Sequence, residues 1–341
     1  MKRRSNAIRR AAILHAVCFV AAMCTAGIGF AADEALFVSK QISPTNEYAP
    51  GIEGPSVSAA GDLFVMNMRR PGGDPNKKGG IGRLKPGASR SELFAVLPDN
   101  SVGNGSRFDS QGRLYVADYV NHKIFMFTPG DNSPHEYFVG DFHQPNDLAI
   151  ATDGTLYASD PKATDGIGQI WRITRGPDGL VRGAVMSPPR TMGITNGIDL
   201  SPDGATLYVS ESQFSQAGQI RHASVWAYRI DGAALTGPRL VIEFPQGDVD
   251  GLRVDTDGRI LVARPSFGAV AVVTPDGHLV REVKTAGTDP TNVSFGGPDG
   301  RDVFVTQAQS KHRFIERFRT DRPGREPCLQ PQTPACKPIS P

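Results

Sequence analysis

The chain has 341 residues, of which 39% are hydrophobic and 21% charged, and its formal net charge is +2 at pH 7. This length is ample for a large hydrophobic core. The near-balance of charge argues against a surface that binds nucleic acid or anionic membranes.

Residues 1–31 are predicted to form a secretory signal peptide. A start with five Lys and Arg residues and no acidic residue precedes an apolar run over residues 11–30, which leads into Gly29-Phe30-Ala31. We therefore expect cleavage after Ala31 and a periplasmic or secreted protein with no stable membrane insertion. A retained anchor is the alternative, but an Ala-rich run this mild is a weak spanning helix. Loss of the signal leaves 32 basic residues (37 − 5) against 35 acidic residues, a net charge of −3.

Residues 32–320 contain six copies of one unit, in which a turn with glycine precedes a short apolar strand. Examples are SQGRLYVAD, TDGTLYASD and TDGRILVAR. Successive turn glycines are 51, 42, 50, 54 and 42 residues apart, and each copy is followed by further strand-like segments. A period of about 40–50 residues with four strands is typical of β-propellers. The turn glycines are Gly61, Gly112, Gly154, Gly204, Gly258 and Gly300.

The repeats predict an all-β fold, a six-bladed β-propeller with four antiparallel strands per blade, named A to D from the axis outward. In the sixth blade, strand A is expected near residues 292–295, strand B near residues 303–306 and strand C in RFIERFR. This blade has no fourth strand of its own. The N-terminal segment ALFVSKQIS of the mature chain is expected to supply it and to close the ring, which removes free strand edges.

Residues 321–341 are predicted to form a Pro-rich tail. Cys328 and Cys336 stand close together in CLQPQTPAC. In an exported protein such an even pair indicates a disulfide that closes a small loop, whereas a metal site would need more soft ligands. We expect the tail to be a terminal appendage away from any chemistry.

A polar side chain occurs eight residues before each turn glycine. All six are carboxylates or carboxamides, although the intervening residues vary. Equal spacing places them at the start of strand A, the innermost strand, so their oxygens are expected to converge at one mouth of the central channel. Independent loop caps are the alternative, but they do not explain an acid or amide in every copy. The six residues are Glu53, Asn104, Asn146, Asn196, Asp250 and Asn292.

Converging oxygens without His or Cys favour a hard cation. Calcium accepts about six to eight oxygen ligands in a forgiving geometry, whereas magnesium sheds water reluctantly. Zinc prefers nitrogen or sulfur ligands. We therefore expect Ca2+, with Mg2+, Mn2+ and Zn2+ as alternatives, and Glu53 and Asp250 supply two negative charges that match a divalent ion.

At these residues the chain resembles the gluconolactonase and regucalcin (senescence marker protein) family of calcium-dependent hydrolases, which is related to diisopropyl fluorophosphatase. The resemblance extends through Thr320 and rests on EGP, NG..FD..GRLYVAD, PND, TNGIDLSPDG, DGLRVDTDG and TNVSFGGPDG. It implies metal ligands at Glu53, Asn146, Asn196 and Asp250. Asn104 and Asn292 share their level and are expected to line the channel or to hold water and substrate.

The resemblance implies a lactonase that opens a sugar-type or related lactone, so the expected partner is a small-molecule lactone or ester. Calcium would act as a Lewis acid on the carbonyl oxygen, with Asp250 as general base toward water. Direct nucleophilic attack by Asp250 and a role as ligand only are open alternatives. Phosphotriester hydrolysis and a non-catalytic, calcium-containing, ligand-binding propeller are the alternative functions.

The B–C loops are expected to rim the substrate entrance, because strand A runs away from the mouth and strand B returns to it. Blade 1 has the basic loop NMRRPGGDPNKKGG, and blade 4 has SQFSQAGQIRHAS. His143 and Arg107 are predicted to line the channel or contact substrate. Gln144 stands where the family has an arginine that binds sugar.

Overall fold

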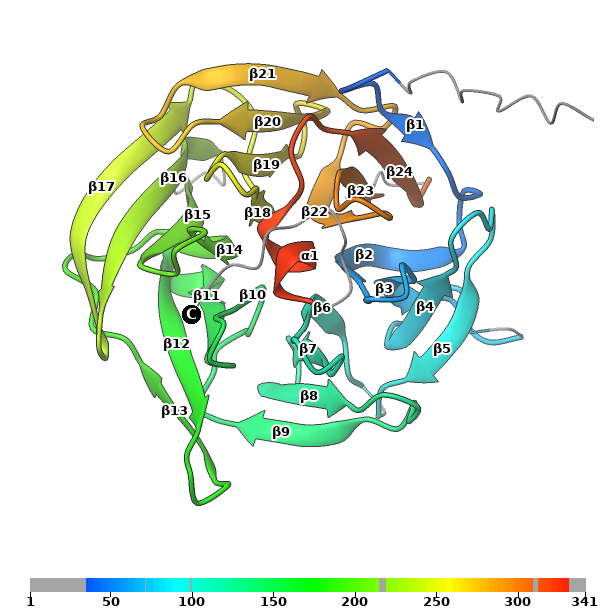
Figure 1. The fold of residues 1–341 in the computed structure, drawn as a ribbon, viewed down its shortest axis with the longest axis horizontal. Helices are drawn as coiled ribbons and strands as arrows, with labels where there is room; N and C mark the ends of the chain where they lie inside the picture. Colours follow the sequence, from blue (N-terminus) through cyan, green and yellow to red (C-terminus); the bar gives the residue numbers. More distant parts are fainter. Residues whose placement is uncertain (1–34, 71, 99, 215–218, 309–311, 331–341) are drawn as a thin grey trace, which may run out of the picture. The chain divides into compact units, whose positions relative to one another are not determined.

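The protein is described by a computed structural model that covers residues 35–70, 72–98, 100–214, 219–308 and 312–330. Within these ranges it forms six four-stranded antiparallel sheets arranged as blades around an axis (Figure 1). The predicted six-bladed propeller is confirmed. The predicted signal peptide and Cys336 lie outside the described residues. No helix in the described ranges has the length and hydropathy needed to cross a membrane.

Strands of equal rank in the blades can be compared directly. Strands A are β2 (Tyr48–Val57), β6 (Gly103–Phe108), β10 (Leu148–Ile150), β14 (Ile194–Leu200), β18 (Leu252–Val254) and β22 (Pro290–Gly296). Strands B are β3 (Leu63–Met68), β7 (Leu114–Asp118), β11 (Leu156–Lys162), β15 (Thr206–Phe214), β19 (Ile260–Arg264) and β23 (Asp302–Gln307). Strands C are β4 (Gly80–Leu84), β8 (Lys123–Phe127), β12 (Ile167–Arg175), β16 (Ile220–Asp231), β20 (Ala269–Val273) and β24 (Phe314–Arg319). Strands D are β5 (Glu92–Val96), β9 (His135–Val139), β13 (Val181–Val185), β17 (Ala234–Phe244), β21 (Leu279–Lys284) and β1 (Lys40–Gln41).

The N-terminal segment closes the ring, as predicted. Strand β1 pairs antiparallel with β24, with Lys40 opposite Arg317, and becomes the fourth strand of blade 6. The paired part is shorter than ALFVSKQIS, since only two residues form the strand. A one-residue bridge between Leu36 and Arg319 extends the contact.

The A–B turns explain the recurring glycine. All six turn glycines have positive φ, between 71° and 86°, which is the left-handed region that glycine enters without strain. In blade 3 the Asp153 side chain accepts a hydrogen bond from the Thr155 N–H at 2.8 Å, and Ala151 N–H bonds to Thr155 O at 2.9 Å. Short polar side chains and glycine thus fix where strand A ends and strand B begins.

The hydrophobic core lies between the blades. In the described part of the chain six clusters of buried side chains each fill one blade–blade interface. Between blades 1 and 2, for example, Phe64 contacts Phe94 and Phe108 edge to face, with ring centroids 4.9 and 5.2 Å apart. Alternate residues of each strand face the two neighbouring interfaces, so the packing holds every strand A at a fixed height along the axis.

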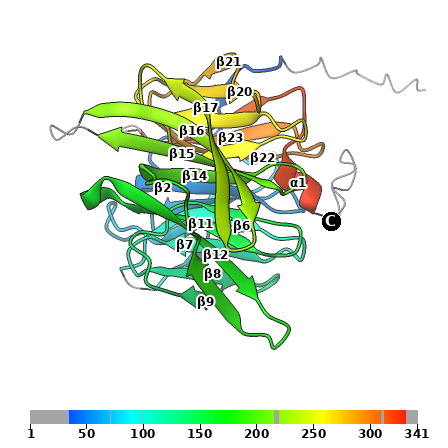
Figure 2. The ribbon, with the colours of Figure 1, turned by 90° about the vertical axis from the view of Figure 1, so that its left-hand side faces the viewer.

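Two short helices complete the described residues. The 3-10 turn η1 (Ala163–Asp165) joins β11 to β12, and the helix α1 (Arg325–Leu329) follows blade 6. Helix α1 lies at the centre of the ring in Figure 1 and at one end of it in Figure 2. Gly324 N–H donates to Gly300 O and Thr256 N–H to Pro323 O, so α1 is on the side of the A–B turns. We call this side the far end, and the side where the strands A begin the mouth.

Candidate functional site

The six polar positions lie at one level around the axis. At four of them the next residue is glycine, and a Cβ there would overlap with the adjoining blade. Built on Gly54, it would lie 1.8 Å from the Asn104 carbonyl oxygen, and built on Gly197, 2.5 Å from that of Asp250. Equivalent positions of adjacent strands A are therefore in contact, which only glycine permits at this distance. The four glycines are Gly54, Gly105, Gly197 and Gly251.

Hydrogen bonds connect the two acidic positions through blade 6. Gly251 N–H donates to the Thr291 carbonyl oxygen at 2.8 Å. Asn292 Nδ2 donates to Glu53 Oε2 at 3.3 Å. Asp250, Asn292 and Glu53 therefore follow one another around the mouth, and the two carboxylates lie on either side of one amide.

Both carboxylates have raised pKa values. Burial raises the pKa of Glu53 to about 7, and the charge of Asp147 adds to this, against a hydrogen bond from Gly54 N–H. Burial also raises the pKa of Asp250 well above its usual range, helped by the negative charges of Glu53, Asp248 and Asp147. Among the described residues no Lys, Arg or His forms an ion pair with Glu53 or Asp250. The two acids thus form a concentration of negative charge without a protein counter-ion.

The amide oxygens differ in whether they accept a hydrogen bond. Asn104 Oδ1 and Asn196 Oδ1 are buried and accept no hydrogen bond within the described residues. In contrast, Asn292 Oδ1 accepts from Val293 N–H at 2.9 Å while its Nδ2 donates to Glu53. A buried carbonyl oxygen without a donor is unfavourable unless another group satisfies it.

This donor set fits a hard divalent cation. Two carboxylates with raised pKa values and unsatisfied amide oxygens are the groups that calcium coordinates. No cluster of three or more His, Cys, Asp or Glu side chains suited to a metal occurs in the described ranges, so a site here would be a mixed one of acids and amides. The predicted ligands Glu53, Asn146, Asn196 and Asp250 all lie at the mouth level. Asn292 donates to Glu53, and its expected contact with water or substrate stays a prediction.

Carboxylates at the ends of strands B hold the loops that lead into the polar positions. In blade 3, buried Asp160 accepts from the backbone N–H of His143 and Gln144 at 2.9 and 2.6 Å and from Trp171 Nε1 at 2.9 Å. In the neighbouring blades the equivalent acceptors are Asp118, for Val102 N–H, and Glu211, for Gly193 N–H. His143 is half-buried just before Asn146, and its contact with substrate stays a prediction.

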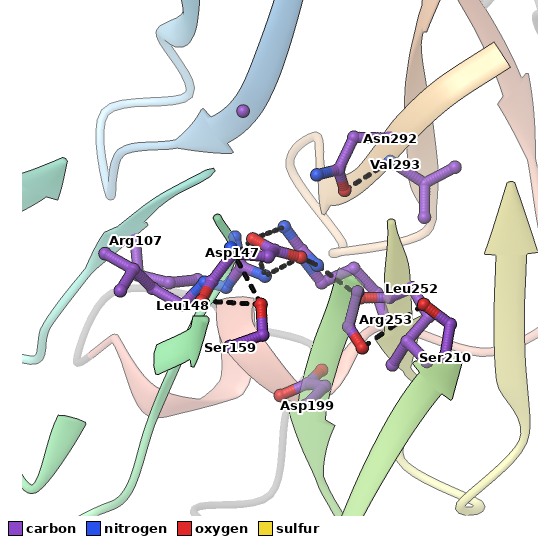
Figure 3. A network of polar contacts seen from close by, with 12 residues as sticks. Arg107, Asp147, Leu148, Ser159, Asp199, Ser210, Leu252, Arg253, Asn292 and Val293 are labelled. Atoms are coloured by element: carbon purple, nitrogen blue, oxygen red, sulfur yellow. Dashed lines mark hydrogen bonds and ion pairs between the residues drawn. The ribbon is translucent and has the colours of Figure 1, made fainter. Parts of the chain in front are cut away.

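Below the mouth, Asp147 forms a buried ion-pair network (Figure 3). Its carboxylate contacts Arg107 Nη2 at 3.2 Å and Arg253 Nη1 at 2.9 Å, and all three side chains are fully buried. Burial raises the pKa of Asp147, but the two guanidinium groups reverse this, so that its pKa lies below the usual range. Arg107 was predicted as a substrate or channel contact; because its guanidinium is buried on carboxylates below the mouth, we assign it a structural role instead.

Helix α1 completes this network from the far end. Glu326 forms ion pairs with Arg107 at 2.5 Å and Arg253 at 3.6 Å. Arg325 pairs with Asp199 at 3.4 Å and donates to the Ile150 carbonyl oxygen at 2.9 Å. The expectation of a terminal appendage is therefore wrong for residues 325–330, all of which except the half-buried Leu329 are buried. The predicted disulfide of Cys328 stays a prediction, since its partner lies outside the described residues.

A cavity of about 720 Å³ also lies at the far end, between blades 1 and 6. It is lined by the A–B turns of both blades and by Gln330. It is separate from the six polar positions, which are at the mouth.

The family model described as SMP-30/Gluconolactonase/LRE-like region matches residues 135–309, just over half of the chain. The chain belongs to this family. It is 25% identical to a gluconolactonase of Zymomonas mobilis over 255 residues, 67% of each chain. It is 26% identical to a pentonolactonase of Haloferax volcanii, over 62% of this chain and 68% of that one. The structure of a regucalcin from Agrobacterium tumefaciens, described as a calcium-binding protein, shares the fold: the TM-score is 0.65 at 19% identity, over 82% of this chain and 95% of the other.

For this member of the SMP-30/gluconolactonase/LRE-like family, sequence reasoning missed Asp199 and Arg253 and gave Arg107 a different role; all three lie below the mouth. Arg107, Asp199 and Arg253 each occur three residues after a mouth residue. Counting five residues back from the turn glycine, instead of eight, finds these charged residues in blades 2, 4 and 5. Glu326 and Arg325 carry no such signal, because they lie outside the repeats.

Proposed function

We propose that the protein is an exported lactonase that opens a sugar-type or related lactone with the help of a calcium ion. Relatives named as a gluconolactonase and a pentonolactonase support lactone hydrolysis by this chain. Glu53, Asn146, Asn196 and Asp250 are the residues that would hold the ion. The signal-like N-terminus supports export to the periplasm or beyond.

The observation that carries the proposal is the pair of acids at the mouth. Glu53 and Asp250 are half-buried, lie on either side of Asn292 and have no cationic partner among the described side chains. A structural protein has no reason to leave two partly buried acids uncompensated, whereas strongly perturbed carboxylates are common at catalytic sites. When bound, calcium would supply two positive charges and Lewis acidity toward the lactone carbonyl.

The residues of the chain would then bind and activate the reactants. Asp250 Oδ accepts a proton from the attacking water, whose oxygen bonds to the carbonyl carbon of the lactone. The ring C–O bond breaks, and the proton passes to the departing ring oxygen, which yields a hydroxy acid. Asn292 holds Glu53 in place, and Asn104 Oδ1, which has no donor among the described residues, is available to a water or a substrate hydroxyl.

A lactone panel on metal-stripped protein tests the proposal. We expect no turnover of glucono-δ-lactone or γ-lactones after chelation and recovery of at least about a hundredfold on reloading with calcium. Paraoxon in the same panel tests the phosphotriesterase alternative. Calcium binding without turnover of any substrate would instead identify a binding propeller, and full activity in the stripped protein would contradict the metal site.

A further inference from the structure

The rim of the mouth between blades 6 and 1 carries positive charges close to Glu53. The half-buried Lys78, in the loop between β3 and β4, directs its ammonium toward strand A of blade 1. A Cβ built on Gly51 would lie 3.3 Å from Lys78 Nζ, and Gly51 is two residues before Glu53. Lys78 has no hydrogen bond or ion pair within the described ranges, so its charge has no partner among these residues.

Two arginines lie together on the same rim. Arg69 N–H bonds to the Glu47 carbonyl oxygen at 3.0 Å, and Asn46 N–H bonds to the Arg313 carbonyl oxygen at 2.8 Å. The two arginines are thus attached to consecutive residues of one segment. Arg69 Nε is buried and has no acceptor among the described residues. Burial and the charge of Arg69 lower the pKa of Arg313.

Glu47, whose carbonyl oxygen accepts from Arg69 N–H, forms no ion pair with Lys78 or Arg69 among the described side chains. The Glu47 carboxylate accepts from Ser91 N–H at 3.2 Å and lies 3.7 Å from Arg90, so it is directed toward the outer strands. Glu53 and Asp250 would be balanced by a divalent cation. The entrance would then have an excess of positive charge, which attracts anions and raises their local concentration.

We propose that Lys78 and Arg69 form a subsite for an oxyanion group, such as a carboxylate, at the end of the lactone remote from its carbonyl. This inference rests on the proposed function and makes the preferred substrate an acidic sugar lactone rather than a neutral one. Arg313 adds positive charge behind the subsite. Arg70 is not part of it, because its guanidinium is directed to the Leu97 carbonyl oxygen, 3.5 Å away, near strand β5.

The subsite is tested by comparing two lactones that differ in charge, on calcium-loaded protein. Lys78→Met is expected to raise KM for glucaro-γ-lactone, which has a free carboxylate, by about tenfold. It should leave KM for the neutral glucono-δ-lactone unchanged. Added salt should raise KM for the acidic lactone only, because it screens the attraction.

Lys85→Met is the matched control, since it removes the same charge from the same blade. Lys85 follows β4 at the far end, where it pairs with Glu92 at 3.1 Å. We expect it to change neither KM. Equal effects of Lys78→Met on both lactones, or no effect on either, would overturn the subsite while leaving the lactonase intact.

Binding of the dianion glucarate and the monoanion gluconate, measured by calorimetry, separates the subsite from catalysis. Tighter binding of glucarate, lost in Lys78→Met and kept in Lys85→Met, would support the subsite even if no lactone were turned over. Failure of turnover alone would then count against the proposed function. Equal affinity for both acids in the wild-type protein would contradict the subsite.

Discussion

The two ends of the propeller axis differ in whether their acidic side chains have basic partners. Below the mouth and toward the far end, the three acids of the axial network have basic partners: Asp147 lies between two arginines, Glu326 contacts the same pair, and Asp199 contacts Arg325. At the mouth, Glu53 and Asp250 have no basic partner among the described residues. A buried charge is costly unless it is paired, so the paired end is explained by stability and the unpaired end needs a ligand.

Helix α1 makes this difference possible. It brings one acid and one base into the network, so the network keeps its balance while the helix covers the far end of the axis. Solvent and substrate are therefore expected at the mouth alone.

The largest effect is expected from Asp250→Asn at the mouth. Loss of the base and of one negative charge should lower kcat for lactone hydrolysis by about a thousandfold, within the range for removal of a general base. Asp248→Asn is the control, because it removes an acid that contributes to the raised pKa of Asp250 but binds Ser212 Oγ instead. Asp248→Asn should lower kcat severalfold at most. Similar activity in wild type and Asp250→Asn would rule out the mechanism.

Glu326→Ala at the far end should lower the free energy of unfolding rather than kcat for lactone hydrolysis. It leaves two buried guanidinium groups with one carboxylate between them, and breaking a buried pair costs about 3–5 kcal/mol of unfolding free energy. Removal of Glu92 from its exposed pair with Arg83 should cost much less, because water screens an exposed ion pair. Denaturant unfolding measures both. Equal losses would mean that the far-end network is not stabilising.

Calcium should stabilise the protein more at high pH than at low pH. The pKa of Glu53 is raised from 4.5 to about 7 and that of Asp250 is raised too, so the metal-free folded state holds protons that the unfolded state releases. Its stability therefore falls as pH rises through this window. Bound calcium replaces those protons, so the calcium-induced rise in Tm should be larger by a few degrees at about pH 8 than at about pH 5.

The control for this pH effect is the double variant Glu53→Gln, Asp250→Asn. It should lose the calcium response and the part of the pH dependence that comes from the mouth. A calcium-induced Tm shift in the wild type that is the same at both pH values would contradict the raised pKa values of the two acids.

The smallest effect is expected from Asn292→Ala. Asn292 orients Glu53 without offering its own oxygen, and loss of such a supporting hydrogen bond typically lowers metal affinity by about tenfold or more. Calorimetric titration with calcium measures it. Asn196→Ala should weaken binding further, since Asn196 Oδ1 has no other partner among the described residues. The reverse order would exchange the roles of the two amides.

The fold and the level of the site were predictable because both follow from short-range repetition. A left-handed glycine ends each A–B turn, and a constant eight residues separates it from a polar side chain, so the repeat alone places Glu53 and Asp250 at the same end of blades 1 and 5. The register of the sheets then keeps residues of equal spacing at equivalent positions in the folded blades. The closing strand from the N-terminus was predictable for a similar reason, since blade 6 lacked a strand.

The amino-acid sequence by itself determined the number of blades, the start of each strand A and the residue types at the mouth, since these depend on local periodicity. Only the tertiary structure decided which charges are neutralised. Arg107 and Arg253 come from different blades, yet both pair with Asp147. Both also pair with Glu326, which lies outside the repeats. Pairing of that kind depends on distances across the axis, which no spacing along the chain encodes.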